Sequence, residues 1–147
     1  MNERDVREKV LMFRFFELHK TIANRTNKYF NKDGFDLQVE QFPVLMIPYF
    51  KGTVSQQEIA DITGRDKSSI LRSIISLTGK GFLVTAQDPF DKRKKMVQLS
   101  KEGKKLAEKI ASEIVRLDQV IFSCLSADER ATMEALLEKC KNHVMTL

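Results

Sequence analysis

The sequence predicts a mainly α-helical protein with a small β-hairpin, and three features of its 147 residues carry that prediction. Apolar residues recur at three- and four-residue steps over long segments near both ends, as on one face of an α-helix. In the middle, two short segments with the same periodicity flank Gly64. A run that alternates apolar and polar side chains follows and turns back through a basic segment, as a β-hairpin does.

The N-terminal segment, residues 3–31, is predicted to form one long helix. Its apolar stripe is wide for an isolated surface helix, which indicates that the helix packs on two surfaces. The stripe contains Leu11, Phe15, Leu18, Ile22, Thr26 and Tyr29. Residues 32–34 are a turn signal. Residues 37–50 also have helical periodicity, but Pro43 and Pro48 each remove a backbone donor, so we expect a short or kinked helix there.

Two short helices follow. Ser55 and Glu58 have the spacing of a capping box, which opens a helix over residues 56–63. Gly64 supplies a turn, and a second helix is predicted from about residue 67 to residue 80. The side chains expected to point inward are Ile59, Ala60 and Ile62 on the first helix and Ile70, Leu71, Ile74 and Leu77 on the second. Two short helices joined by a glycine turn have helix-turn-helix spacing.

The hairpin comprises predicted strands at residues 82–86 and 95–99, joined by the turn residues 88–91. Ser100 then caps a long helix to about residue 123, and Ser126 with Glu129 opens the last helix. The apolar face of that last helix contains Met133, Leu136, Leu137, Cys140 and Val144. A helix-turn-helix followed directly by a basic hairpin is a winged-helix layout. We therefore predict a winged helix-turn-helix lobe at residues 36–100, between dimerisation helices at residues 1–35 and 101–147.

The positive charge of the chain is concentrated in residues 64–105, which comprise the second helix of the pair, the hairpin and the start of the helix that follows. The net charge is +5, yet residues 64–105 contain eleven basic and four acidic residues, a net +7 that leaves −2 for the rest. Such a distribution indicates a binding lobe for an anionic partner on a separate scaffold. The longest apolar stretch, residues 42–50, is too short for a membrane span, and the mixed-charge N-terminus excludes a secretory signal.

Double-stranded DNA is the partner that this arrangement favours. The second helix of the pair fits the major groove, and a hairpin tip reaches the adjacent minor groove. Candidate contacts from the second helix are Arg65, Lys67, Ser68, Ser69, Arg72 and Ser73. Candidates from the wing are Asp91, Lys92, Arg93, Lys94 and Lys95. Ser55 and Gln56, at the start of the first short helix, are candidates for a phosphate contact. The alternative for Ser68 and Ser69 is that they only cap the helix.

The wing carries the most specific pattern in the chain. Its Asp88, Pro89, Asp91 and Arg93 match the Asp-Pro-x-Asp-Arg-Arg wing of MarR-type transcriptional regulators, and the sequence resembles that family over nearly its whole length. The resemblance implies that Arg93 enters the minor groove and that Asp91 orients it. Lys92 departs from the usual arginine, which keeps the charge but loses the planar, two-pronged donor geometry.

The resemblance also implies a homodimer, and the three apolar-striped helices outside the lobe favour one independently. A dimer would bind a pseudo-palindromic operator with half-sites about 10 bp apart, as a repressor or, less often, an activator. The alternative is a monomer that buries these stripes internally. The family's small aromatic or anionic effectors suggest a cleft lined by Phe13, Phe16, His19 and Tyr49, although aromatic residues at helical spacing commonly pack in a core.

Other functions are less favoured. The sequence has no nucleophile–His–carboxylate set and no glycine-rich phosphate loop, so we expect neither an enzyme nor a cofactor. Two cysteines and two histidines lack metal-ligand spacing, and Cys140 falls on an apolar face, so neither metal nor redox sensing is expected. A winged-helix module that binds protein or RNA is the alternative to an operator-binding regulator. We expect a cytoplasmic, nucleoid-associated protein with no membrane partner.

Overall fold

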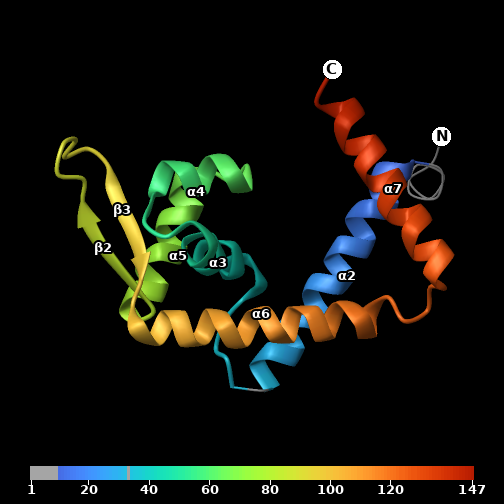
Figure 1. Ribbon diagram of the computed structural model, residues 1–147, viewed down its shortest axis with the longest axis horizontal. Coiled ribbons are helices and arrows are strands. Elements are labelled where there is room, and N and C mark those ends of the chain that lie inside the picture. Colours follow the sequence, from blue (N-terminus) through green and yellow to red (C-terminus); the bar gives the residue numbers. More distant parts are fainter. Residues whose placement is uncertain (1–9, 33) are drawn as a thin grey trace. The chain divides into compact units, whose positions relative to one another are not determined.

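The computed structural model describes residues 10–32 and 34–147, and its elements are labelled in Figure 1. Helix α2 spans Leu11–Lys32. It confirms the predicted N-terminal helix over this range, while residues 3–9 of the prediction lie outside the described residues. Near its end Phe30 is fully buried, with its ring edge-on to the rings of Phe35 and Phe42. This aromatic cluster anchors the C-terminal end of α2 in the core.

The proline-containing segment forms a short helix, one of the two alternatives expected, preceded by a separate 3-10 turn. A 3-10 turn, η1, spans Val39–Gln41, and α3 follows at Phe42–Lys51. Pro43 lies in the first turn of α3, where its missing N–H costs nothing, whereas Pro48 lies inside the helix and is buried. The α-helix therefore starts five residues later than the predicted boundary at residue 37.

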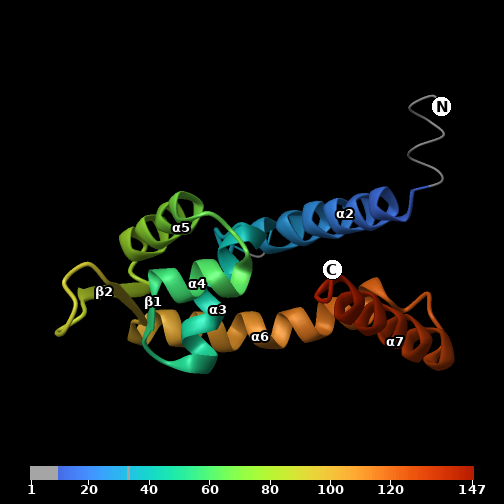
Figure 2. The ribbon, with the colours of Figure 1, turned by 90° about the horizontal axis from the view of Figure 1, so that it is seen from above.

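The predicted helix-turn-helix is confirmed. Helix α4 spans Gln56–Thr63 and α5 spans Lys67–Gly79, with Gly64 between them in the left-handed conformation at φ 64°. Both bonds of the predicted capping box are present: Ser55 N–H donates to Glu58 at 2.7 Å, and Glu58 N–H donates to the Ser55 hydroxyl at 3.1 Å. Helices α3, α4 and α5 pack on one another (Figures 1 and 2).

Two of the side chains expected to face inward do not. Ile62 is 52% exposed, because it lies about 200° around the short helix from buried Ala60. Leu71 is only half-buried, since it sits beside the inward stripe that fully buried Ile70, Ile74 and Leu77 form.

The wing is confirmed, with one additional strand. Strands β2, Leu83–Gln87, and β3, Lys95–Leu99, pair antiparallel, and β1, Val54–Ser55, joins the other edge of β3. Two residues are too few for an alternating pattern, which is why the sequence did not indicate β1. Val97, on the central strand β3, is paired with one residue of β1 and one of β2, and it is fully buried. The β2–β3 hairpin projects beyond α4 and α5 (Figure 1).

Helix α6 spans Lys101–Ile121 and ends two residues before the predicted position. The predicted cap is present, since the Ser100 hydroxyl accepts the N–H of Gly103 at 2.9 Å and donates to the carbonyl of Gly81 at 2.6 Å. Gly103 is buried, and a Cβ placed on it would lie 1.8 Å from the carbonyl oxygen of Phe82. The first turn of α6 is thereby held against the residue that precedes β2.

The chain divides into two compact units, Met1–Ala111 and Ser112–Leu147. The second contains the rest of α6 and α7, Ala127–Val144, with the predicted capping box at Ser126 and Glu129. No residue of α7 is buried. Its predicted apolar face is therefore largely uncovered, and Cys140, which was placed on that face, is exposed, as is Cys124. The domain limits at residues 35 and 100 stay a prediction.

Candidate nucleic-acid interface

The start of α5 presents three of the predicted contacts to solvent. Lys67, Ser68 and Arg72 are exposed. The cap of α5 is Asp66, whose carboxylate accepts the N–H of Ser69 at 2.8 Å. Ser68 and Ser69 therefore do not cap this helix, and the outward side of its first turns is left to a lysine, a serine and an arginine.

Two predicted contacts, one on α5 and one just before it, do not extend from the exposed side of the helix. Ser73 is only 7% exposed, so its assignment as a DNA contact is wrong: it lies on the inward side of α5 beside Ile74. Arg65 is half-buried, with one guanidinium nitrogen donating to the carbonyl of Glu40 at 2.6 Å and the other to the Ser69 hydroxyl at 2.5 Å. Sequence spacing could not reveal this, because Glu40 lies 25 residues away in the chain.

The wing tip is built by two aspartates that cap successive turns. The Asp88 carboxylate accepts the N–H groups of Phe90, at 2.8 Å, and Asp91, at 2.9 Å. These bonds, with a smaller contribution from Lys94, hold the pKa of Asp88 below its usual value. The cap is therefore lost as the pH falls through this lowered pKa, at a lower pH than for an aspartate without these bonds.

Asp91 acts on the backbone of the wing arginine. Its carboxylate accepts the N–H of Arg93 at 3.0 Å, and the side chain of Arg93 is exposed. That Asp91 orients Arg93 in the minor groove stays a prediction; the contact in the structure is with the backbone from which the guanidinium extends. Sequence reasoning also missed Phe90, which is 98% exposed at the tip. The sequence feature that could have indicated Phe90 is an aromatic residue inside a turn, outside any periodic apolar pattern.

A cavity of about 340 Å³ joins the three predicted parts of the interface. Its lining comes from the start of α4, the start of α5 and the wing, and consists of Ser55, Gln56, Gln57, Lys67, Arg93, Lys94 and Lys95. Four of the seven are basic and none is acidic. The Gln56 amide donates to the carbonyl of Lys67 at 3.3 Å and so links the two helix starts. Gln57 is the lining residue that sequence reasoning did not select.

The two acidic residues that adjoin lining residues in sequence, Glu58 and Asp66, are committed to the caps of α4 and α5. Bonds from the N–H and the hydroxyl of Ser55 lower the pKa of Glu58, and the positive charges of Lys51 and Lys94 lower it further. Its charge is therefore directed toward the helix start and does not line the cavity. The electrostatic field at the cavity favours an anion that spans α4, α5 and the wing.

The residues predicted for an effector cleft are dispersed between two elements. Phe13, Phe16 and His19 are exposed on α2, and half-buried Tyr49 lies on α3 against Phe50. They do not line the basic cavity. Over the described ranges, 10–32 and 34–147, no helix is long and apolar enough to cross a membrane. Within the same ranges, no three His, Cys, Asp or Glu residues are grouped to hold a metal ion.

A helix-turn-helix, a wing and a basic cavity between them define a winged helix-turn-helix protein. No protein-family model matches the chain. It is 30% identical over 147 residues to the uncharacterised HTH-type transcriptional regulator YkoM of Bacillus subtilis, covering 97% of this chain and 92% of that protein. It is 30% identical over 105 residues to the multiple antibiotic resistance protein MarR of Salmonella typhimurium, covering 71% of this chain and 73% of MarR.

Solved structures agree with the sequence comparison. A mutant of MarR from Escherichia coli, complexed with operator DNA, superposes with a TM-score of 0.81 at 26% identity. The match covers 92% of this chain and 96% of that one. The chain belongs to the MarR family of transcriptional regulators. Members of this family are not enzymes.

Proposed function

We propose that this protein is a sequence-specific regulator of transcription that binds double-stranded DNA. The observation that carries the proposal is the 340 Å³ cavity, in which basic residues from α5 and the wing face a helix start with no acidic side chain among them. A phosphate group of the DNA backbone matches this site in charge, and the amides of Gln56 and Gln57 can donate further hydrogen bonds to it. Such a contact would fix the register of the duplex on the lobe. The predicted phosphate contact of Ser55 is corrected, because Ser55 is only 8% exposed and its hydroxyl is engaged with Glu58 in the cap of α4.

Base recognition is then assigned to exposed side chains on either side of the cavity. Ser68 and Arg72 extend from the first turns of α5 and would reach base edges in the major groove, while Lys67, which lines the cavity, would contact the phosphate. Arg93 extends from the wing toward the minor groove, whose narrow tracts attract arginine. Phe90 beside it would pack its exposed ring on the sugars or between base steps. Lys92 and Lys94 add sequence-independent attraction to the backbone.

The regulator is proposed to act as a homodimer and as a repressor. The support for a dimer is the amount of apolar surface that the chain leaves uncovered on helices outside the lobe. On α2 this surface includes Leu11, Met12, Phe13, Phe15, Phe16 and Leu18, and in the second unit it includes Val115, Val120, Leu136, Leu137 and Val144. Apolar exposure of this extent is typical of an interface between subunits. Repression would follow if the dimer occupies an operator that overlaps a promoter.

Selection of bound duplexes from a random pool tests the proposed function. We expect the enriched sequences to contain an inverted repeat whose half-sites are centred about 10 bp apart, because a two-fold dimer presents two recognition helices to successive major grooves. Enrichment of a single unrepeated site would contradict the dimer. Equal retention of all duplexes would contradict sequence-specific binding, and preference for single-stranded RNA would favour the alternative winged-helix module.

An effector is proposed as well, because Phe13, Phe16 and His19 expose aromatic and imidazole groups on one stretch of α2. These α2 side chains offer ring stacking and hydrogen bonds to a small aromatic or anionic molecule, whereas Tyr49 lies apart from them on α3. We expect aromatic carboxylates such as benzoate to release the protein from its selected duplex, and the release to require Phe16. If benzoate released the wild type and Phe16→Ala from the duplex equally, these residues would not form the effector site.

A further inference from the structure

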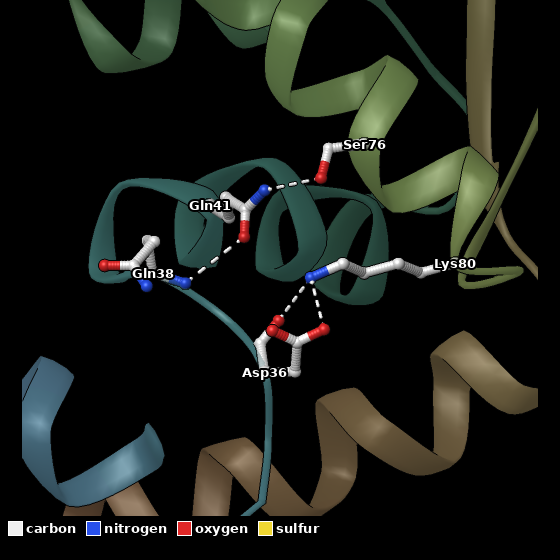
Figure 3. Close-up of polar contacts among 5 residues, drawn as sticks. All are labelled: Asp36, Gln38, Gln41, Ser76 and Lys80. Atoms are coloured by element: carbon white, nitrogen blue, oxygen red, sulfur yellow. Dashed lines mark hydrogen bonds and ion pairs between the residues drawn. The ribbon is translucent and has the colours of Figure 1, made fainter.

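The segment that connects α2 to α3, residues 36–41, makes three contacts with the recognition helix α5 and its flanking residues, one at the N-terminal end and two at the C-terminal end. Figure 3 shows two of these contacts, at Ser76 and at Lys80, with the segment lying across one side of α5. The third involves Arg65, directly before the helix. None of the three is predictable from local sequence, because the partners are 25 to 44 residues apart.

The contact at the C-terminal end of α5 is made by Lys80. Its ammonium donates to the carbonyl of Asp36 at 2.5 Å and lies 2.9 Å from the carboxylate of the same residue. Asp36 has a φ of 46°, in the left-handed region that aspartate tolerates better than most residues. This backbone conformation presents the carbonyl and the carboxylate to the same ammonium group (Figure 3).

The contact with the last turn of α5 is made by Gln41. Its amide nitrogen donates to the hydroxyl of Ser76 at 3.1 Å, and its amide oxygen accepts the N–H of Gln38 at 3.2 Å (Figure 3). Because both ends of the amide are used, the side chain has one orientation in which all its recorded partners are satisfied. The hydrogen bond to Ser76 therefore fixes the distance between the turn η1 and the last turn of α5.

The contact at the N-terminal end is made by Arg65. Its guanidinium joins the Glu40 carbonyl, in η1, to the Ser69 hydroxyl, on the first turn of α5. The fork of the guanidinium is used for two acceptors inside the lobe, which a lysine ammonium on a flexible stem could not reproduce with the same geometry. Arg65 thus belongs to the support of α5 although it stands beside the exposed Lys67.

The 36–41 segment is in turn held by α2. The side-chain oxygen of Asn27, on α2, accepts the N–H of Val39 at 2.6 Å. The ring of Phe30 lies 4.8 Å from that of Phe35, before the segment, and 4.6 Å from that of Phe42, after it. Contacts from α2 therefore hold the segment from one side, while its three contacts with α5 lie on the other.

We propose that Arg65, Gln41 and Lys80 are positioning residues for DNA binding, which set the orientation of the recognition helix relative to α2 without touching the duplex. The proposal rests on the proposed function, because it concerns how α5 is presented to the major groove. A contact with the duplex contributes fully to the binding free energy only when the side chains of α5 already have the orientation that the contact requires. Loss of one support then weakens binding while leaving every phosphate contact available.

Arg65→Lys tests this role, because it keeps the positive charge and removes the fork. We expect the affinity for the selected duplex to fall about tenfold, since two internal hydrogen bonds are disturbed. The slope of log affinity against log salt should stay at the wild-type value, because no phosphate contact is lost. Arg65→Ala should behave in the same way.

Lys67→Ala is the matched control, because it removes a basic side chain two positions further along that is exposed and lines the cavity. We expect its salt slope to fall by about one phosphate contact. If Arg65→Lys bound like wild type while Arg65→Ala reduced the slope as Lys67→Ala does, Arg65 would be a phosphate ligand and the proposal would be overturned.

Lys80→Met provides a second variant at the other end of α5, in case substitution of Arg65 impairs folding. It keeps an unbranched side chain and removes both contacts with Asp36. We expect about a fivefold loss of affinity at an unchanged salt slope, with a melting temperature within a few degrees of wild type. Wild-type affinity in this variant would contradict the positioning role. Absence of duplex binding by the wild-type protein would instead contradict the proposed function.

Discussion

Arg93→Ala is expected to weaken binding of the selected duplex by about 10- to 100-fold at physiological salt, the range typical of one specific arginine contact. The side chain is exposed, lines the basic cavity, and extends from a backbone that the Asp91 carboxylate holds through the Arg93 N–H. Its loss would remove both charge and the minor-groove contact. Fluorescence anisotropy with a labelled duplex measures the effect directly.

Arg25→Ala is the control for that experiment, because it removes the same guanidinium from an exposed position on α2 that does not line the cavity. We expect it to bind nearly as tightly as wild type. If Arg93→Ala and the wild type bound the duplex with equal affinity, the wing would not be part of the interface. Equal losses in the two arginine variants would show that net charge alone, rather than placement, determines binding.

Gly103→Ala is expected to have the largest effect on stability, a loss of about 3 kcal/mol or more in the free energy of unfolding. The new Cβ would lie 1.8 Å from the carbonyl oxygen of Phe82 and 2.8 Å from its carbonyl carbon. Neither atom can move freely, because that oxygen also accepts the N–H of Ser100 at 3.0 Å. Thermal unfolding followed by circular dichroism should show a melting temperature lower by about 10 °C.

The matched substitution is Gly79→Ala, at the end of α5. A Cβ at this position meets no atom within 4 Å, and the backbone there is helical. We expect a gain of about 0.5–1 kcal/mol, because alanine loses less conformational entropy than glycine on entering a helix. If the melting temperature of Gly103→Ala equalled that of the wild type, the start of α6 would not be packed against Phe82 in solution.

Most elements of the lobe were predictable because their signals are local. The capping boxes at Ser55 and Ser126 each lie within four residues, and the structure contains both. The left-handed turn at Gly64 and strand β3 also follow from one residue or from a short alternation. Interactions between neighbours in sequence form regardless of the rest of the chain, so a pattern can indicate them.

The site was predictable in part, for the same reason. Lys67, Arg72 and Arg93 are exposed as expected, because basic side chains near a helix start or a hairpin tip seldom find a place in a core. Ser73 was misassigned because polarity alone does not show which side of a helix faces inward. Strand β1 escaped prediction because its partner is more than 40 residues away.

By itself, the sequence determined the order of the helices, the wing, the concentration of positive charge in residues 64–105 and the resemblance to MarR-type regulators. The tertiary structure alone decided that Arg65 faces Glu40, that wing and helix starts share one cavity, and that Gly103 lies against Phe82. The physical reason is the distance along the chain between the residues that interact. Charge, caps and periodicity are properties of neighbouring residues, whereas each of these three arrangements depends on backbone groups that only folding brings together.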